Sequence, residues 1–186
     1  MRTLATRLRG PILIEPVVHR DERGSFHESY RRNAMAELGI DDDFVQDNHS
    51  RSARGVVRGL HFQVGDGQAK LVRCSAGAIV DVVVDIRRGS PTYGEWEAFE
   101  LDDENSRLLY VPIGFAHGFC AISGMADVLY KCSAYHDPAA ERGIAYDDPD
   151  IGIEWPAGLA LLASDRDATA PPLREIADEL PFEYQG

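Results

Sequence analysis

Short runs of β-branched and aromatic residues alternate with turn residues along most of the chain. Glycine and proline recur between the runs at short intervals, which leaves room for strands but not for long helices. Many short strands at this spacing indicate a sandwich or barrel rather than alternating strand–helix units. The runs that we expect to form strands are Ile12–Val18, Gly55–Phe62, Lys70–Ser75, Ala78–Ile86, Gly94–Leu101, Leu108–Val111, Gly118–Ile122 and Asp127–Tyr135.

Only two segments have the features of helices. Arg31–Gly39 contains helix-forming residues and ends on a glycine, whereas Pro171–Leu180 begins with proline and carries apolar residues at helical spacing. Both are expected to pack outside the β-core. At 186 residues, the chain is long enough for one domain with a substantial core. We therefore predict a single all-β domain over residues 1–186, closed or double-sheeted, with an N-terminal strand segment and a C-terminal helical tail.

The formal net charge of −12 opposes general binding to nucleic acid or to an anionic membrane, but it permits a small cationic pocket. No run approaches the roughly 20 apolar residues of a membrane span. The segment Met1–Gly10 lacks the apolar stretch of a signal peptide. The three cysteines form no CxxC pair and are expected to be buried in a reducing compartment. These features predict a cytoplasmic protein without a nucleic-acid or membrane partner.

The segment Gly55–Gln63, GVVRGLHFQ, places Arg58 and His61 three residues apart in an expected strand. Side chains of an ideal strand alternate between its faces, so these two would point in opposite directions. A bulge at Gly59 would bring both to one face. Taken alone, His61 is equally well explained as a hydrogen-bonded core histidine and Arg58 as a surface charge. Cationic residues elsewhere favour a shared cavity instead: Lys70, Arg73 and His117.

The segment Pro112–Phe119, PIGFAHGF, has the PxGxxH spacing of the second metal-binding motif of cupin barrels. The first motif should supply HxH and then a carboxylate, but here His61 is followed by Gln63 and Lys70. A divalent cation needs three or four imidazole or carboxylate ligands, and a lysine ammonium opposes it. We therefore expect no metal. A cavity containing lysine, arginine and histidine instead suits developing negative charge, such as an enolate beside a nucleotide diphosphate.

Nine motifs follow one another along the chain: DERGSFHE, FVQDNHSRS, GVVRGLHFQ, QAKLVR, DVVVDIRRGSPTYG, PIGFAHGF, VLYK, DPAAERGIAYDDP and LLASDRD. In this order they resemble the dTDP-4-dehydrorhamnose 3,5-epimerase family, and the resemblance runs from about Ile12 to Leu173. It implies an all-β, cupin-like double-stranded β-helix (jelly roll) with a few short peripheral helices. It also implies a homodimer that needs neither a metal nor another cofactor.

The resemblance assigns roles to individual residues. His61 matches the family's general base, and Asp167 matches the acidic partner of that base. Tyr130 matches the proton donor, and Lys70 matches the group that stabilises an enolate. The implied reaction converts dTDP-4-dehydro-6-deoxy-D-glucose to dTDP-4-dehydro-L-rhamnose. The remaining positions expected to bind substrate are Arg23, Glu28, Gln46, Asn48, Arg58, Gln63, His117, Glu141 and Arg166.

The residue types agree with this chemistry. A carbonyl at C4 of the hexose acidifies the protons at C3 and C5, and removal of either gives an enolate. A histidine with an ordinary pKa near ~6.5 suits the base. A tyrosine with an ordinary pKa near ~10 can return the proton, because the enolate is more basic. Taken alone, however, Tyr130 would pass as a core tyrosine and Asp167 as a turn or helix-cap residue.

Two positions depart from the family pattern. His136 stands where the family commonly has a second tyrosine, and Arg166 stands where lysine is frequent. Either change can alter how the sugar lies, and therefore whether both centres are inverted. The alternatives are a narrower dTDP-4-keto-sugar 3- or 5-epimerase, a non-catalytic cupin-fold sugar-nucleotide binding protein, and a metal-dependent cupin oxygenase.

Overall fold

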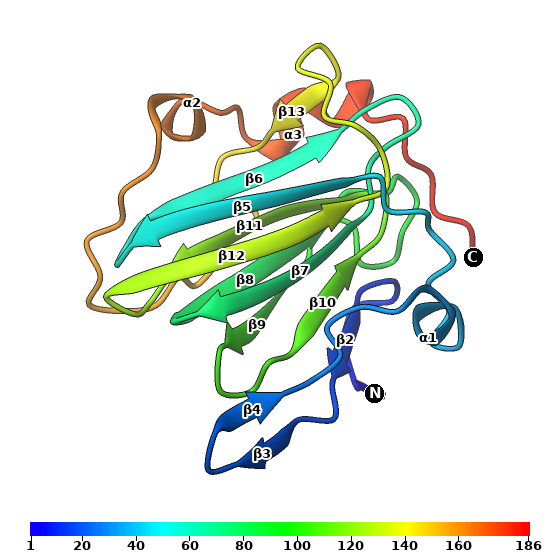
Figure 1. The fold of residues 1–186 in the computed structure, drawn as a ribbon. Helices are drawn as coiled ribbons and strands as arrows, with labels where there is room; N and C mark the ends of the chain where they lie inside the picture. Colours follow the sequence, from blue (N-terminus) through cyan, green and yellow to red (C-terminus); the bar gives the residue numbers. More distant parts are fainter.

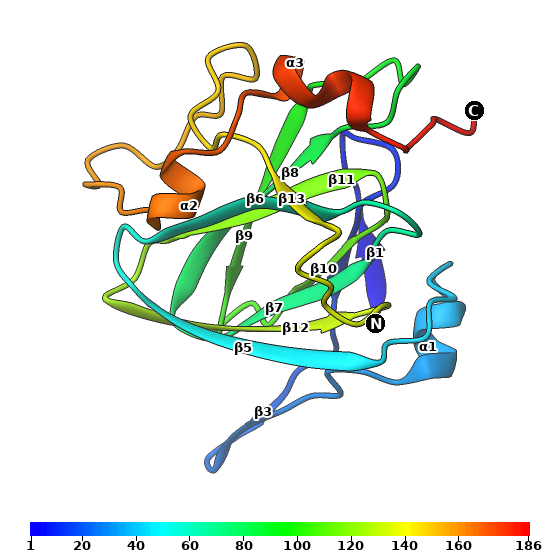
Figure 2. The same cartoon turned by 90° about the horizontal axis from the view of Figure 1, so that it is seen from above.

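Two antiparallel sheets face each other in the computed structural model, which describes residues 1–186 (Figures 1 and 2). The six-stranded sheet has the spatial order β1 (Arg2–Leu4), β2 (Ile12–Glu15), β10 (Leu108–Val111), β7 (Lys70–Ala76), β12 (Met125–Cys132) and β5 (Gln46–Ala53). The five-stranded sheet has the order β13 (Glu141–Gly143), β6 (Val57–Gln63), β11 (Phe115–Ala121), β8 (Ala78–Asp85) and β9 (Trp96–Asp102). A separate hairpin consists of β3 (His19–Asp21) and β4 (Gly24–Phe26).

The main hydrophobic core lies between the two sheets. Val72, Leu109 and Val128 of the six-stranded sheet pack against Val83 and Phe119 of the five-stranded sheet, and all five are buried. Alternation along each strand directs these side chains inward and their neighbours outward. The double-sheeted all-β prediction is therefore confirmed, and the architecture agrees with a jelly roll.

The helices are short and lie outside the sheets, as predicted. Leu173 of α3 (Leu173–Ile176) and Leu180, which follows a 3₁₀ turn (Ala177–Glu179), cover the outer face of the five-stranded sheet. Helix α1 (Arg32–Ala36) places Met35 against the outer face of the other sheet. A further helix, α2 (Asp165–Ala168), was not predicted, because four residues are too few for a periodic pattern. No helix is both long and apolar enough to cross a bilayer.

The strand predictions are wrong at one polar segment and at one segment that contains proline. β5 was not expected, because its sequence QDNHSRSA is polar, yet it pairs along its whole length with β12. Pairing at the edge of the sheet and burial of one face override its weak strand propensity. β2 ends at Glu15 rather than Val18, since Pro16 has no backbone N–H to donate to the sheet.

The predicted bulge in β6 is present. Arg58 and His61 are three residues apart on β6, but their partners Phe119 and His117 on β11 are only two apart. The extra residue on β6 lets Arg58 and His61 face the same cavity. Gly59 has a positive φ of 134° and lies against β11, so that a Cβ there would be 2.5 Å from Gly118 Cα.

We therefore predict that Gly59→Ala destabilises the fold more than an equally strained glycine substitution elsewhere. Gly24 is the matched control, because its φ is 124° but a Cβ there would meet nothing within 4 Å. A positive φ at a non-glycine residue costs about 1–3 kcal/mol, and the backbone clash at Gly59 adds to this cost. Denaturant unfolding should show a lower free energy of unfolding for Gly59→Ala than for Gly24→Ala. Equal losses would contradict the close approach of β6 and β11.

Candidate active site

A cavity of about 530 Å³ opens between the sheets and is lined by residues from both. β6 and β11 contribute Arg58, His61 and His117 from one side, whereas β7 and β12 contribute Lys70 and Tyr130 from the other. These five predicted site residues lie on four different strands, and three more, Glu141, Arg166 and Asp167, line the same cavity. This arrangement places a base candidate and an acid candidate on facing walls.

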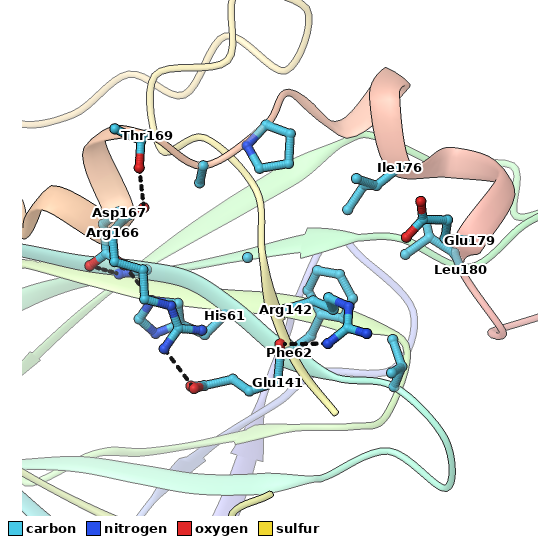
Figure 3. Close-up of a pocket in the computed structure, with 15 residues that line it drawn as sticks. His61, Phe62, Glu141, Arg142, Arg166, Asp167, Thr169, Ile176, Glu179 and Leu180 are labelled. Atoms are coloured by element: carbon cyan, nitrogen blue, oxygen red, sulfur yellow. Dashed lines mark hydrogen bonds and ion pairs between the residues drawn. The ribbon is translucent and has the colours of Figure 1, made fainter. Parts of the chain in front are cut away.

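His61 and Asp167 form a partly buried hydrogen-bonded pair that lines both this cavity and the neighbouring one drawn in Figure 3. His61 Nε2 lies 2.7 Å from Asp167 Oδ1. Ser164 caps α2 by accepting the Asp167 backbone N–H at 3.1 Å, which fixes the position of the aspartate. Burial alone would raise the pKa of Asp167, but His61, the Gly59 N–H and Ser164 outweigh it and hold the pKa below its usual value. Asp167 is therefore ionised at neutral pH and can only accept hydrogen bonds.

Lys70 and Tyr130 stand on the six-stranded sheet, opposite His61. Lys70 is buried, and its Nζ lies 3.5 Å from the backbone oxygen of His61. Burial lowers the pKa of Lys70, while Cys132 and Glu141 act in the opposite sense. Burial also raises the pKa of Tyr130, which keeps the phenol protonated at neutral pH. The two groups therefore supply a cation and a proton donor to one cavity.

His117 forms a second imidazole–carboxylate pair, with a partner that sequence reasoning missed. Its Nε2 lies 2.9 Å from both carboxylate oxygens of Asp81, and the Asp81 side chain is fully buried. Asp81 belongs to the apolar run AIVDVVVD of β8. A lone charge in such a run was the available signal, because a buried carboxylate requires a partner.

Glu141 and Arg166 meet at the boundary between the main cavity and a neighbouring one of about 330 Å³ (Figure 3). Arg166 Nη1 donates to Glu141 Oε2 at 2.6 Å, and His136 Nε2 lies 3.1 Å from the same oxygen. His136 and Arg166, which are expected from the sequence to depart from the family pattern, therefore contact one carboxylate. Burial tends to raise the pKa of Glu141, but His136 and Arg166 together hold it below its usual value.

The polar residues of β5 and the end of β6 support the cavity. Asn48 pairs in register with Tyr130, and Gln46 donates to the Asn48 side chain at 3.0 Å. Arg58 lines the cavity while its Nε donates to Ser52 Oγ at 3.0 Å. Gln63 lies outside the cavity lining and instead accepts the Asp137 backbone N–H at 3.0 Å. Gln63 therefore holds the loop that carries His136.

The structure of one chain does not bring Arg23 and Glu28 to the cavity. Arg23 lies in the turn of the β3–β4 hairpin, which projects from the body of the molecule (Figure 2), and its side chain is 85% exposed. Glu28 follows the hairpin and pairs with Arg31. Neither residue lines the cavity that contains His61.

The donor set of the cavity does not suit a metal ion. No three side chains of histidine, cysteine, aspartate or glutamate converge closely enough to bind one. His61 and His117 already bind carboxylates through Nε2, and Lys70 adds an ammonium to the same cavity. A lysine at this place opposes a divalent cation.

Comparisons with known proteins agree with this geometry. The sequence model of the family described as dTDP-4-dehydrorhamnose 3,5-epimerase matches residues 5–175. A dTDP-4-dehydrorhamnose 3,5-epimerase of Methanothermobacter thermautotrophicus is 50% identical over 176 residues, which cover 94% of this chain and 95% of the relative. A dTDP-4-dehydrorhamnose 3-epimerase of Streptomyces niveus is 47% identical over 180 residues, covering 96% of this chain and 86% of the relative.

A solved structure resembles the whole chain as well. The crystal structure of dTDP-6-deoxy-D-glucose-3,5-epimerase from Legionella pneumophila, in complex with dTDP-4-keto-L-rhamnose, superposes with a TM-score of 0.96. It is 47% identical in sequence, and the match covers 100% of this chain and 99% of that one. The family model matches most of the chain, and the relatives share about half of its residues over nearly its whole length. The chain therefore belongs to the dTDP-4-dehydrorhamnose 3,5-epimerase family.

Proposed function

We propose that this protein converts dTDP-4-dehydro-6-deoxy-D-glucose to dTDP-4-dehydro-L-rhamnose by inverting C3 and C5. The observation that carries the proposal is the placement of His61 on one sheet and of Lys70 and Tyr130 on the facing sheet, all lining one cavity. A hexose ring between the two walls would have a base on one face and an acid on the other. Epimerisation requires this arrangement, because the proton must return to the opposite face.

His61 acts as the general base in this proposal. Since ionised Asp167 accepts a hydrogen bond from Nε2, the neutral ring has its lone pair on Nδ1. Nδ1 removes the proton from C3 or from C5, and the resulting imidazolium is stabilised by Asp167. The same base can serve both carbons if the sugar shifts within the cavity.

Lys70 and Tyr130 complete the reaction. The electron pair of the broken C–H bond moves to the C4 oxygen, where the Lys70 ammonium stabilises the enolate. Tyr130 then donates its proton to the carbon from the other face, which inverts that centre. No electrons are gained or lost, so the reaction itself needs no redox cofactor, and we propose that it needs no metal.

The remaining cations suit the nucleotide part of the substrate. Arg58 lies at the rim of the cavity, and Arg166 stands beside the His61–Asp167 pair. Both can form paired hydrogen bonds with diphosphate oxygens. We also propose a cytoplasmic location, which is supported by three buried cysteines that form no disulfide.

A narrower 3-epimerase is the second candidate. The Streptomyces niveus relative, a dTDP-4-dehydrorhamnose 3-epimerase, is 47% identical over 96% of this chain. His136 and Arg166, the two departures, contact the carboxylate of Glu141, which lines the cavity. These contacts can change the tilt of the sugar and thereby favour one carbon over the other.

We also propose that two copies form a homodimer in which Arg23 and Glu28 reach the partner's cavity. The β3–β4 hairpin projects from the molecule, and its Phe26 is 74% exposed. An exposed aromatic ring on such an arm favours burial against another protein surface. Exchange of the arms would place these two residues at a cavity that lacks them within its own chain.

The assigned reaction predicts deuterium incorporation at two carbons. Incubation of the protein with dTDP-4-keto-6-deoxy-D-glucose in D₂O should exchange and invert both C3 and C5, as followed by NMR. Activity should survive treatment with EDTA, because the reaction needs no metal. Exchange at C3 alone would favour the narrower 3-epimerase, and no exchange at either carbon would exclude this substrate.

The two proton-transfer roles predict different defects. His61→Ala should lower exchange at both carbons by about 10²–10⁴-fold, the usual contribution of a general base. Tyr130→Phe keeps the ring and removes the acid, so proton removal by His61 should continue while inversion slows. We expect this variant to exchange faster than it epimerises. Unchanged epimerisation by Tyr130→Phe would assign the acid role to another group.

If the β3–β4 hairpins are exchanged between the two copies of the proposed dimer, two inactive variants should complement each other. Arg23→Ala and His61→Ala should each be inactive or nearly so, whereas mixed dimers would contain one intact cavity. Random mixing should restore about a quarter of wild-type activity, since half of the dimers are mixed and each has one working site. Mixing each variant with itself is the control. Failure to recover activity from demonstrably mixed dimers would place Arg23 outside the partner's site.

A further inference from the structure

The pair Asp81–His117 lies in the interior and is separate from the pair that contains the proposed base. Both carboxylate oxygens of Asp81 lie 2.9 Å from His117 Nε2. The Asp81 side chain is 0% exposed and that of His117 is 8% exposed. His117 lines the cavity of about 530 Å³, and Asp81 does not. The imidazole therefore stands between a buried carboxylate and the space that would hold the hexose.

Two neighbours of Asp81, His117 and Lys70, act against the effect of burial on its carboxyl group. Its carboxylate has no hydrogen-bond partner other than His117. Burial raises the pKa of Asp81 above its usual value, and the charge and hydrogen bond of His117 and the Lys70 ammonium offset only part of this rise. The other charged or titratable groups that line the cavity are Arg58, His61, Tyr130, Glu141, Arg166 and Asp167. None of these groups forms a hydrogen bond with Asp81. The bond between Asp81 and His117 therefore decides which ring nitrogen of His117 carries the proton.

We propose that Asp81 is a positioning residue that keeps the proton of His117 on Nε2 and leaves Nδ1 as a hydrogen-bond acceptor for the hexose. Both carboxylate oxygens lie 2.9 Å from the same nitrogen, which fits two acceptors around one N–H group. In this arrangement Nε2 donates and the carboxylate accepts. Nδ1 has no hydrogen-bond partner within the protein, and it is not among the polar atoms that are sealed from solvent without a partner. It is therefore available to a ligand in the cavity.

The hydroxyl on C3 of the hexose is the group that this acceptor would bind. His117 pairs in register with His61, and Lys70 Nζ lies 3.5 Å from the backbone oxygen of His61. This assignment rests on the proposed function, which places the C4 oxygen at Lys70 and the reacting carbon at His61. The only hydroxyl next to a C4 carbonyl in this substrate is on C3. A hexose without it would leave Nδ1 buried and unpaired, and the site should reject it.

The first test measures the tautomer directly and needs no substrate. Long-range ¹H–¹⁵N correlation spectra of protein labelled at its histidine nitrogens report which ring nitrogen carries the proton, and His117→Asn assigns the signals. We expect ligand-free His117 in the Nε2–H form. A proton on Nδ1 of the neutral ring would overturn the proposal, because Asp81 would then be the donor.

The second test measures selectivity for the hydroxyl. Deuterium exchange at C5 can be followed both for dTDP-4-keto-6-deoxy-D-glucose and for its 3-deoxy counterpart. Wild-type protein should prefer the hydroxylated substrate by at least about 10²-fold in kcat/KM. Asp81→Asn places an amide donor beside Nε2, so the proton should shift towards Nδ1 and the preference should fall about tenfold or more. The affinity for dTDP itself should not change.

Asp85→Asn is the matched control. Asp85 lies on the same strand and is also 0% exposed, but its carboxylate binds Arg87, Ser90 and Thr92. This variant should lose stability and keep both the tautomer of His117 and the preference for the hydroxyl. Equal loss of preference in both variants would reduce Asp81 to a structural role and overturn the proposal.

Further outcomes separate this inference from the proposed reaction. If Asp81→Asn fails to fold, Asp81→Leu removes the acceptor without adding a donor, and the wild-type tautomer still decides the first test. An Nε2–H form of His117 without any exchange by the wild-type protein would contradict the reaction while supporting the role of Asp81. Normal exchange with no preference for the hydroxyl would contradict the assignment of Nδ1 to that hydroxyl.

Discussion

The hydrogen bond between Asp167 and His61 links the C-terminal part of the chain to strand β6 of the five-stranded sheet. It joins residues 106 positions apart in the sequence and has a length of 2.7 Å. Backbone bonds between Leu162 and the start of β6 hold the intervening segment against the same strand, and Ser164 fixes the first turn of α2. The orientation of the imidazole, the position of Arg166 and the contact with Glu141 all depend on this docking. A small displacement of α2 would therefore disturb the proposed base and the neighbouring ion pair together.

Charges in the interior are tolerated because each has a partner or a counter-charge nearby. Lys70 and Asp81 are both buried, and each shifts the protonation equilibrium of the other towards the charged form. A single unpaired charge in this position would be strongly destabilising. The inner face of the sandwich is divided accordingly, with the ionisable groups gathered at the cavity and the apolar core beside it. This division lets one pair of sheets serve for both stability and chemistry.

Glu141 connects His136 and Arg166, the two positions expected from the sequence to depart from the family pattern. Arg166 and His136 both bind the same carboxylate oxygen, at 2.6 and 3.1 Å. Because the two groups share one partner, substitutions at them should not act independently. Gln63 contributes to the same unit by holding the loop before Glu141. His136, Glu141 and Arg166 are therefore connected, and a substitution at either His136 or Arg166 would alter the contacts of the same carboxylate.

The pattern of the sequence determined the fold class and much of the site, whereas the tertiary structure decided which polar residues are buried together. β-Branched runs predicted most strands, and Gly59 within GVVRGLHFQ predicted the bulge that brings Arg58 and His61 to one cavity. The polar strand β5 and the four-residue helix α2 could not be predicted, because pairing with β12 and docking on β6 stabilise them rather than local propensity. The partnership of Asp81 with His117 was equally hidden, since it depends on the register between β8 and β11. Sequence spacing specifies which face of a strand a side chain occupies, but contacts between distant strands exist only once the sheets have formed.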